Sequence, residues 1–242
     1  GQYWGEQPGT SGPVYVGAFV CMLFILGLLI VRGPLPWCLL FVTMLSVALS
    51  WGRNMMGLTD FFLDYFPMYD KFRTVASILV IAEFTMPLLS LLGVRALLEH
   101  GGRRDMFDVR PERALWISFG LTAGVCVLFY VMPDVFFSRY VSEQEYSAIM
   151  SLAEHGWPAT DIVDNLNDMR RAVFRADCIR SLGVIVAGTC VLWLTMKKRL
   201  NDRWGVLLIA LVCLVDMWTV DKRYLNSPVR CSVFRDSVSS LN

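Results

Sequence analysis

Charge is scarce in this chain. Only 18% of its 242 residues are charged, against about 25% in an average soluble domain, and 55% are hydrophobic. This composition excludes a disordered chain, which needs low hydrophobicity and high net charge. It also argues against an ordinary soluble enzyme, whose surface helices carry charges throughout. The net charge of +1 gives no bulk attraction to nucleic acid, so we expect no nucleic-acid partner.

Metal and nucleotide motifs are absent from the sequence as well. Its two histidines, His100 and His155, cannot make a His-based zinc site, and no Cys-x-x-Cys occurs. There is no Walker A sequence, no Gly-rich dinucleotide fingerprint and no G-x-S-x-G elbow. We therefore expect no cofactor, and the sequence does not support a divalent metal.

The two ends of the chain also lack familiar elements. The first residue is Gly1, and no basic region or small-residue cleavage site precedes the first apolar run, so no signal peptide is indicated. The chain stops at Asn242 in a polar stretch. We interpret it as a single transmembrane unit, residues 1–242, from the interior of a longer protein.

What the sequence does contain is a series of apolar runs. About 20 apolar residues in a helix are needed to cross a bilayer, and six segments come close to that length. These runs predict an all-α, polytopic integral membrane protein with about six transmembrane helices and amphipathic helices on its outer face. The predicted spans are residues 14–31, 36–50, 74–92, 114–132, 179–196 and 204–220. Gly33-Pro34 predicts a tight turn between the first two.

Lysine and arginine predict the orientation. Loops 32–35, 93–113 and 197–203 carry ten of these residues in 32 positions, whereas the alternate segments carry eleven in 104 positions. Positive charge is enriched in cytoplasmic loops. The prediction is therefore a membrane protein that crosses several times, with both chain ends outside the cytoplasm.

The longest outer segment, residues 133–177, holds eight acidic residues and four basic ones. A capping-box pattern formed by Ser142 and Glu145 predicts one surface helix, which would stop at Gly156. Thr160 is a candidate cap for a second surface helix. Its apolar stripe, which would lie on the bilayer or pack on neighbouring helices, consists of Ile162, Leu166, Met169 and Val173.

Two acidic residues fall within apolar runs. Glu83 lies ten residues after Arg73, about 15 Å deep along a helix, which is near the bilayer midplane. A carboxylate at that depth must be protonated, paired or solvated by a cavity. Glu83 therefore indicates either a wet pocket or ion path, or a neutral side chain bonded to another helix. Asp216, near the outer end of the last run, is expected to reach interfacial water.

Candidate binding residues occur in the outer loop at 51–73. Asp60 and Asp64 are four residues apart and would share one face of a helix that is rich in aromatic residues. An interfacial amphipathic helix is one interpretation. The other adds Lys71 and Arg73, two cations at headgroup level that could hold a lipid phosphate.

The N-terminal stretch, residues 1–15, is rich in Gly, Pro, hydroxyls and aromatic residues. Aromatic faces beside amides, such as Trp4 near Gln7, suit sugar rings, but they also suit an ordinary interfacial turn. The spacing leaves both interpretations open.

Three stretches resemble one family closely. They are YWGEQPGTSGPVYVGA (3–18), DYFPMYDKFRTVASILVIAEFTMP (64–87) and DKRYLN (221–226). Together they are similar to the YfhO family of bacterial membrane proteins, in the version found in Bacteroidetes. The resemblance covers essentially the whole chain but only a central part of a family member. One position departs from the pattern, since Asp70 stands where Asn is more frequent.

The resemblance implies a glycosyltransferase of the all-helical GT-C type. Such enzymes take a sugar from a polyprenyl-phosphate carrier on the outer face of the membrane, and the acceptor would be a cell-envelope glycan or lipid. The catalytic carboxylate of these enzymes generally lies in the first outer loop, which would precede Gly1, so the catalytic residue is unknown here. The implied substrate-binding residues are Lys71, Arg73, Glu83, Trp4, Gln7, Asp60 and Asp64. Lys71 and Arg73 would stabilise the carrier phosphate as leaving group.

Two other functions fit the sequence. Glu83 at mid-bilayer with Pro87 nearby is typical of the broken helices of transporters, which favours a transporter or flippase for a lipid or small solute. A non-catalytic scaffold that assembles envelope enzymes is the third possibility.

Overall fold

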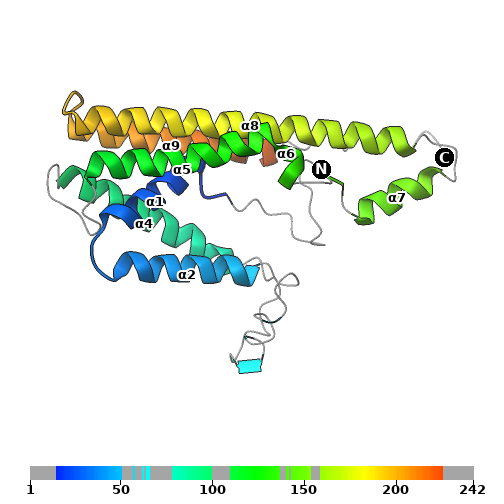
Figure 1. Cartoon of the computed structure of the whole chain (residues 1–242), viewed down its shortest axis with the longest axis horizontal. Helices are drawn as coiled ribbons and strands as arrows, with labels where there is room; N and C mark the ends of the chain where they lie inside the picture. The colour runs from blue at the N-terminus through cyan, green and yellow to red at the C-terminus, as the bar shows by residue number, and fades with distance from the viewer. Residues whose placement is uncertain are drawn as a thin grey trace.

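The computed structural model describes residues 15–50, 57, 62, 64–65, 78–99, 110–136, 140–141, 143–153 and 159–225. Within these residues the protein is all-helical and contains no strand. Figure 1 shows long helices gathered into a bundle, with one helix running well past the others. The predicted all-α class is confirmed.

Four helices are long and apolar enough to cross a membrane: α4 (Leu79–Glu99), α5 (Pro111–Val131), α8 (Ala159–Met196) and α9 (Asp202–Leu225). Each has at least 20 residues, which at 1.5 Å per residue covers a hydrocarbon core of about 30 Å. Two further predicted spans form the shorter helices α1 (Ala18–Ile30) and α2 (Leu35–Ser50). Helices long and apolar enough to cross a membrane are therefore found at four of the six predicted segments, and the total of six spans stays a prediction.

The turn between α1 and α2 forms as the sequence predicted. Gly33 has a φ of 103°, in the region that glycine alone adopts without strain. The Pro34 carbonyl then accepts a hydrogen bond from the Cys38 amide at 3.0 Å, which opens α2.

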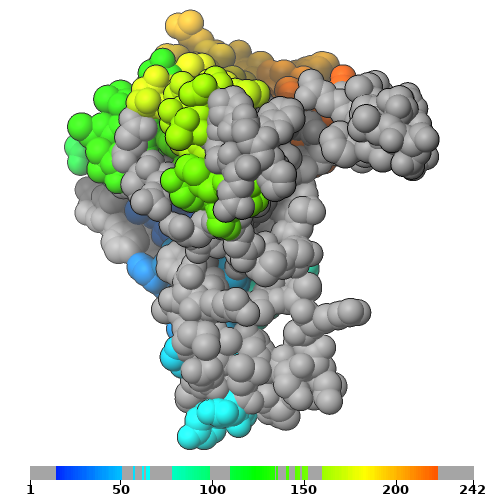
Figure 2. Space-filling view, turned by 90° about the vertical axis from the view of Figure 1, so that its right-hand side faces the viewer, coloured from blue at the N-terminus to red at the C-terminus, as the bar shows by residue number. Residues whose placement is uncertain are grey.

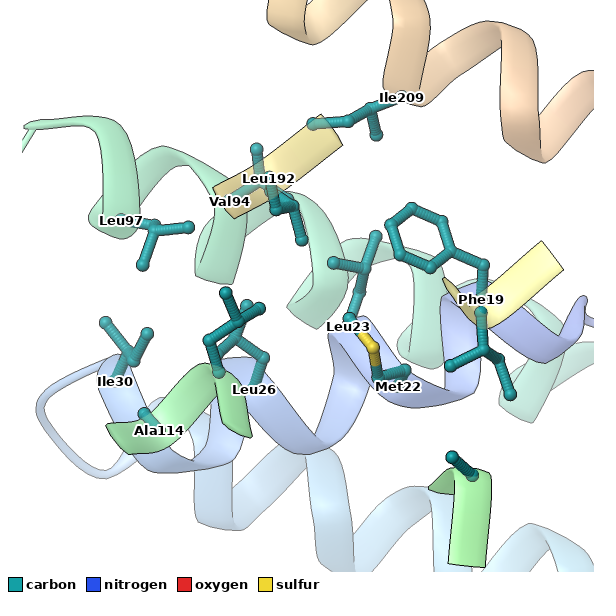
Figure 3. Close-up of a cluster of buried hydrophobic side chains, with 13 residues drawn as sticks. Phe19, Met22, Leu23, Leu26, Ile30, Val94, Leu97, Ala114, Leu192 and Ile209 are labelled. Atoms are coloured by element: carbon teal, nitrogen blue, oxygen red, sulfur yellow. The ribbon is translucent and has the colours of Figure 1, made fainter. Parts of the chain in front are cut away.

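Helix α1 lies at the centre of the core and packs on α4, α5 and α8. It is apolar on every side, as expected for a helix surrounded by others. Phe19 and Met22 near its start, and Ile30 at its end, are fully or almost fully buried (Figure 3). This helix has 13 residues and is about 20 Å long, so tertiary contacts rather than length hold it in place.

Glycines bring α1 and α4 together. A Cβ atom on Gly93 would lie 2.8 Å from the Cα of Gly27, and a Cβ on Gly27 would lie 2.6 Å from the Leu89 carbonyl oxygen. Small residues let helix backbones approach closely, which is a main source of attraction between helices in lipid. Hydroxyl groups add to this contact, since Ser90 donates to the Val20 carbonyl at 3.0 Å.

One end of the bundle holds the α8–α9 turn, residues 197–201, and we call it the 197–201 end. The Lys197 ammonium contacts the Glu112 carboxylate at 2.7 Å, which places the start of α5 there. Ile30 and Leu97, from the last turns of α1 and α4, lie beside Ala114 near the start of α5 (Figure 3). The helix ends gathered here are those joined by loops 32–35, 93–113 and 197–203. The density of Lys and Arg predicted that these three loops lie on one side of the membrane.

Helix α8 corrects the prediction for residues 133–177. The second surface helix and the fifth span are not separate elements but one helix of 38 residues, about 57 Å long. The physical reason is that residues 159–182 contain neither Pro nor Gly, so nothing ends the helix at the membrane boundary. A helix does form where the first surface helix was predicted, as α7 (Glu143–Ala153), after the short α6 (Pro133–Phe136); its place on the outer face stays a prediction.

Candidate functional site

The most completely buried charged group in the described part of the chain is the carboxyl of Asp216, in α9. Its residue is 1% exposed. The Tyr15 hydroxyl, which precedes α1, lies 3.0 Å from each carboxyl oxygen and donates to them. Tyr15 and Asp216 are 201 residues apart in the sequence, so only the fold brings them together.

The same carboxyl group caps α1. The backbone N–H of Ala18, the first residue of α1, donates to Oδ2 of Asp216 at 3.0 Å. Gly17 occupies the position where a side chain would normally cap the helix, with a φ of 102° and no side chain to do so. Asp216 supplies the missing acceptor from another helix, and its negative charge is favourable at a helix N-terminus.

Arg180 of α8 supplies the positive charge. Its Nη2 lies 3.9 Å from Oδ1 of Asp216 and donates to the Tyr15 hydroxyl at 3.2 Å. Its guanidinium carbon stands 5.6 Å from the centroid of the Tyr15 ring, and its Nη1 donates to Thr219 at 3.3 Å. We call Tyr15, Ala18, Arg180 and Asp216 the Asp216 cluster.

The depth of the cluster follows from counting residues. Asp216 is 14 residues after Asp202, about 21 Å from the 197–201 end, and Arg180 is 16 residues before Met196, about 24 Å from it. In a hydrocarbon layer of about 30 Å, both charges lie inside the far boundary. Charges at such depth mark functional sites in many membrane proteins, and here each has its opposite charge beside it.

This geometry corrects the expectation for Asp216. Asp216 does lie toward the end of the bundle opposite the 197–201 turn, as the sequence predicted. Its side chain, however, is buried and does not reach interfacial water. The carboxyl turns inward because Tyr15 and Ala18 offer it hydrogen-bond donors and Arg180 offers it a positive charge. The sequence held one signal of this pairing, an isolated Arg and an isolated Asp at the same ends of two adjacent apolar runs.

Of the substrate-binding residues proposed from the sequence, the two that the structure describes do not lie at this cluster. Asp64 and Glu83 are described, both are exposed, and neither contacts Asp216. Glu83 is the fifth residue of α4, and the residues that precede 78 lie outside the described part of the chain, so its depth in the bilayer stays a prediction. The others lie outside the described residues: Trp4, Gln7, Asp60, Lys71 and Arg73.

A second buried charge docks α7 on α8. Arg170 forms a two-pronged contact with Glu145, at 2.8 and 2.9 Å, and donates to the Tyr140 carbonyl at 2.6 Å. Bidentate contacts of this kind are directional as well as strong. The capping-box pattern predicted that Glu145 would cap the start of α7. In the structure its carboxylate accepts hydrogen bonds from Arg170 of α8.

Metal ligands do not cluster in the described part of the chain. No group of three His, Cys, Asp or Glu side chains there is close enough to hold an ion. The Asp216 cluster offers one carboxylate, one phenol and one guanidinium, a set that suits charge pairing and hydrogen bonding.

Fold and site together define the class: an all-helical protein with several helices able to cross a membrane and a buried ion pair within them. Comparison of the chain with family models, with curated proteins and with solved structures finds no match.

Proposed function

We propose that this chain is part of a membrane-embedded glycosyltransferase that moves a sugar from a polyprenyl-phosphate carrier to a cell-envelope glycan or lipid, on the outer face of the bacterial inner membrane. The observation that carries the proposal is the resemblance of residues 3–18, 64–87 and 221–226 to the YfhO family. An all-helical membrane domain is compatible with it.

The Asp216 cluster gives this resemblance a physical context. The stretch 3–18 ends in Tyr15, Gly17 and Ala18, which surround the Asp216 carboxyl. The stretch 221–226 begins five residues after Asp216, on the same helix. The described ends of these two stretches therefore lie next to or within five residues of Asp216. In the proposed function, the cluster anchors the chain that leads from Trp4 and Gln7, the expected sugar contacts.

In the proposed function, the residues of this chain bind the substrate and do not include the catalytic carboxylate. Lys71 and Arg73 stabilise the departing carrier phosphate by fixed positive charge, while Glu83, Asp60 and Asp64 line the substrate path. The carboxylate that activates the acceptor is expected upstream of Gly1.

A transfer assay tests the proposal. The full-length parent protein, purified in lipid nanodiscs and given radiolabelled polyprenyl-phosphate sugars, is expected to release carrier phosphate, whereas residues 1–242 alone are expected to be inactive. The double variant Lys71→Ala/Arg73→Ala is expected to be at least about a hundredfold slower, since one lost oxyanion donor typically costs that much. Lys198→Ala is the control, because Lys198 is exposed and pairs with Asp202. A gene deletion that changes no envelope glycan, together with no phosphate release in vitro, would contradict the proposal.

The proposed orientation makes a separate prediction. Cysteines are introduced at Asp164, exposed on the protruding part of α8, and at Arg203, exposed at the 197–201 end. An impermeant thiol reagent applied to intact spheroplasts is expected to label Asp164→Cys and to leave Arg203→Cys unlabelled until the membrane is opened. Labelling is measured above that of the parent chain, in which Cys178 is buried. The reverse pattern would place the Asp216 cluster on the cytoplasmic side and remove the proposed access to an outer-face carrier.

One observation favours transport as the second candidate. Asp216 and Arg180 form an ion pair within two helices that can cross a membrane, and such pairs line proton and solute paths in transporters. Flux through reconstituted vesicles that is abolished by Asp216→Asn, while the purified variant stays monodisperse, would support this candidate. Unchanged flux would remove it.

A further inference from the structure

The two ends of the bundle differ in charge. Loops 32–35, 93–113 and 197–203, which join helices at the 197–201 end, contain ten basic and five acidic residues, a net charge of +5. The whole chain has a net charge of +1, so its other residues together have −4. Figure 2 looks onto the opposite end, where α7 and the first part of α8 (yellow-green) reach the surface. The charges that this part of α8 exposes are acidic: Asp161, Asp164 and Asp168.

Three exposed arginines at the 197–201 end carry a charge that no carboxylate neutralises. They are Arg32, just before α2, Arg113, in the first turn of α5, and Arg203, in the first turn of α9. Both lysines of the 197–201 turn are paired with carboxylates, at 2.7 and 3.2 Å. In the described part of the chain, no side chain forms an ion pair or a hydrogen bond with any of the three arginines. Their guanidinium groups are therefore free to bind an anion from outside the chain.

Helix contacts bring the three arginines to one end of the bundle. Arg113 belongs to the turn of α5 that contacts Lys197 of the α8–α9 connection at 2.7 Å. Arg203 follows the same connection along the chain. Arg32 lies in the α1–α2 turn, which Figure 1 shows at the same end as the α8–α9 turn. Ile30, the last residue of α1, packs in one cluster with the start of α5.

Exposed tryptophans surround this end. Four of the five tryptophans that the structure describes lie within two helical turns of it and are 39 to 62% exposed: Trp37, Trp116, Trp193 and Trp204. The fifth, Trp218, is 16 residues further along α9 than Asp202, about 24 Å away. Tryptophan is enriched where lipid headgroups meet acyl chains. The positions of these four side chains therefore indicate the level of a membrane surface.

On α9 the apolar surface continues inward from this level. Leu207, Leu211 and Leu214 follow Trp204 at spacings of three, four and three residues, so they share one face of the helix. Each of these leucines is more than half exposed. An arginine and a tryptophan at the end of an exposed leucine face match the order of phosphate, glycerol and acyl chain in a phospholipid.

We infer that the 197–201 end is a binding surface for anionic phospholipids, in which Arg32, Arg113 and Arg203 contact the phosphates and the four tryptophans lie at the boundary with the acyl chains. Charge complementarity favours this partner, because the net charge of +5 at this end attracts an anionic lipid surface, whereas the rest of the chain is net negative. Arginine suits the contact because its planar fork binds two phosphate oxygens at once. This surface does not depend on the proposed sugar transfer.

Lipid retention measured by native mass spectrometry tests this surface on the full-length parent protein in detergent. Phosphatidylglycerol is titrated against phosphatidylcholine, and we expect preferential retention of phosphatidylglycerol. One cation near an anionic lipid surface favours binding about fivefold. The triple variant Arg32→Gln/Arg113→Gln/Arg203→Gln is therefore expected to lower the affinity for phosphatidylglycerol about tenfold or more and to leave that for phosphatidylcholine unchanged. The corresponding triple Lys variant keeps the charges and should retain most of the preference.

Lys222→Gln is the control for a cation at the opposite end, because Lys222 is exposed in the last turn of α9. We expect it to leave retention unchanged, whereas Arg113→Gln alone should weaken retention of phosphatidylglycerol. Far-ultraviolet circular dichroism verifies that each variant is folded. The inference is refuted if the triple Gln variant retains phosphatidylglycerol as the unsubstituted protein does, if both lipids are retained equally, or if Lys222→Gln and Arg113→Gln have equal effects.

Two further arms test the occupant and the role of the tryptophans. Glycerol 3-phosphate has the phosphate ester without acyl chains, and at millimolar concentration it should not displace the lipid; displacement would assign the arginines to a soluble phosphate ester instead. Trp116→Ala/Trp204→Ala should weaken retention of both lipids, because tryptophan contacts the boundary below any headgroup. Retention of both lipids at the unsubstituted level would contradict the place of the tryptophans in this surface.

Discussion

Replacement of Asp216 by Ala is expected to lower the free energy of unfolding by about 3 kcal/mol, among the largest effects of any single charge removed from this chain. The variant leaves Arg180 without its counter-charge and removes the acceptor from Tyr15 and from the first N–H of α1. Removing one partner of a buried pair generally costs about 3–5 kcal/mol. We expect the lower end because Arg180 is 21% exposed and keeps a 4.0 Å contact with Asp177.

Unfolding in mixed micelles, followed by circular dichroism, measures this effect. Asp202→Ala is the matched control, because Asp202 lies on the same helix in an exposed pair with Lys198, worth about 0.3–0.5 kcal/mol. The double variant Asp216→Asn/Arg180→Gln should cost less than the sum of its two single changes, since neither charge is then left alone. Equal losses for Asp216→Ala and Asp202→Ala would show that the cluster contributes nothing beyond a surface pair.

Gly188→Ala is the second substitution with a large expected effect. A Cβ atom on Gly188 would overlap the ring of Phe19, which is 0% exposed and enclosed by the core around α1. Neither the ring nor the backbone of α8 can move away without opening the core, so we expect a loss of about 1–3 kcal/mol. The measurement is the same unfolding transition in mixed micelles.

The same helix offers the matched control. A Cβ atom on Gly183 would meet nothing within 4 Å, so Gly183→Ala should be neutral or should stabilise α8, by up to about 1 kcal/mol. Adding Phe19→Leu to Gly188→Ala should restore part of the loss, because the smaller side chain vacates the space of the ring. If both glycine variants behave alike, close packing of Phe19 on α8 is not what Gly188 provides.

The helices could be predicted from sequence because their cause is local. Apolar runs of 15 to 19 residues force the backbone to bond within itself, and Gly33-Pro34 ends one run by its own backbone preferences. The all-α class, the Gly33 turn and the grouping of connections at the 197–201 end needed no tertiary information. The predicted boundary between the outer segment, which ended at residue 177, and the span that began at residue 179 did need tertiary information. In α8 a polar helical segment continues into the apolar helix without interruption.

The candidate site was the part that sequence reasoning missed. A lone acid in an apolar run indicates that a partner exists, but the run does not say which residue it is. For Asp216 the partners are Tyr15 and Arg180, from segments 201 and 36 residues away. Glu83 is exposed on α4, and its depth at mid-bilayer, counted from Arg73, stays a prediction.

By itself, the sequence determined that this chain is helical and apolar enough for a membrane, because hydrogen bonding within each helix and burial of apolar side chains depend on the residues of one segment. Only the tertiary structure decided which charges meet. The contact of Asp216 with Tyr15, Ala18 and Arg180 requires three helices to converge at one level. That level is set by the close approach of backbones at residues such as Gly27, Gly93 and Gly188, where the partner atoms come from elsewhere in the chain.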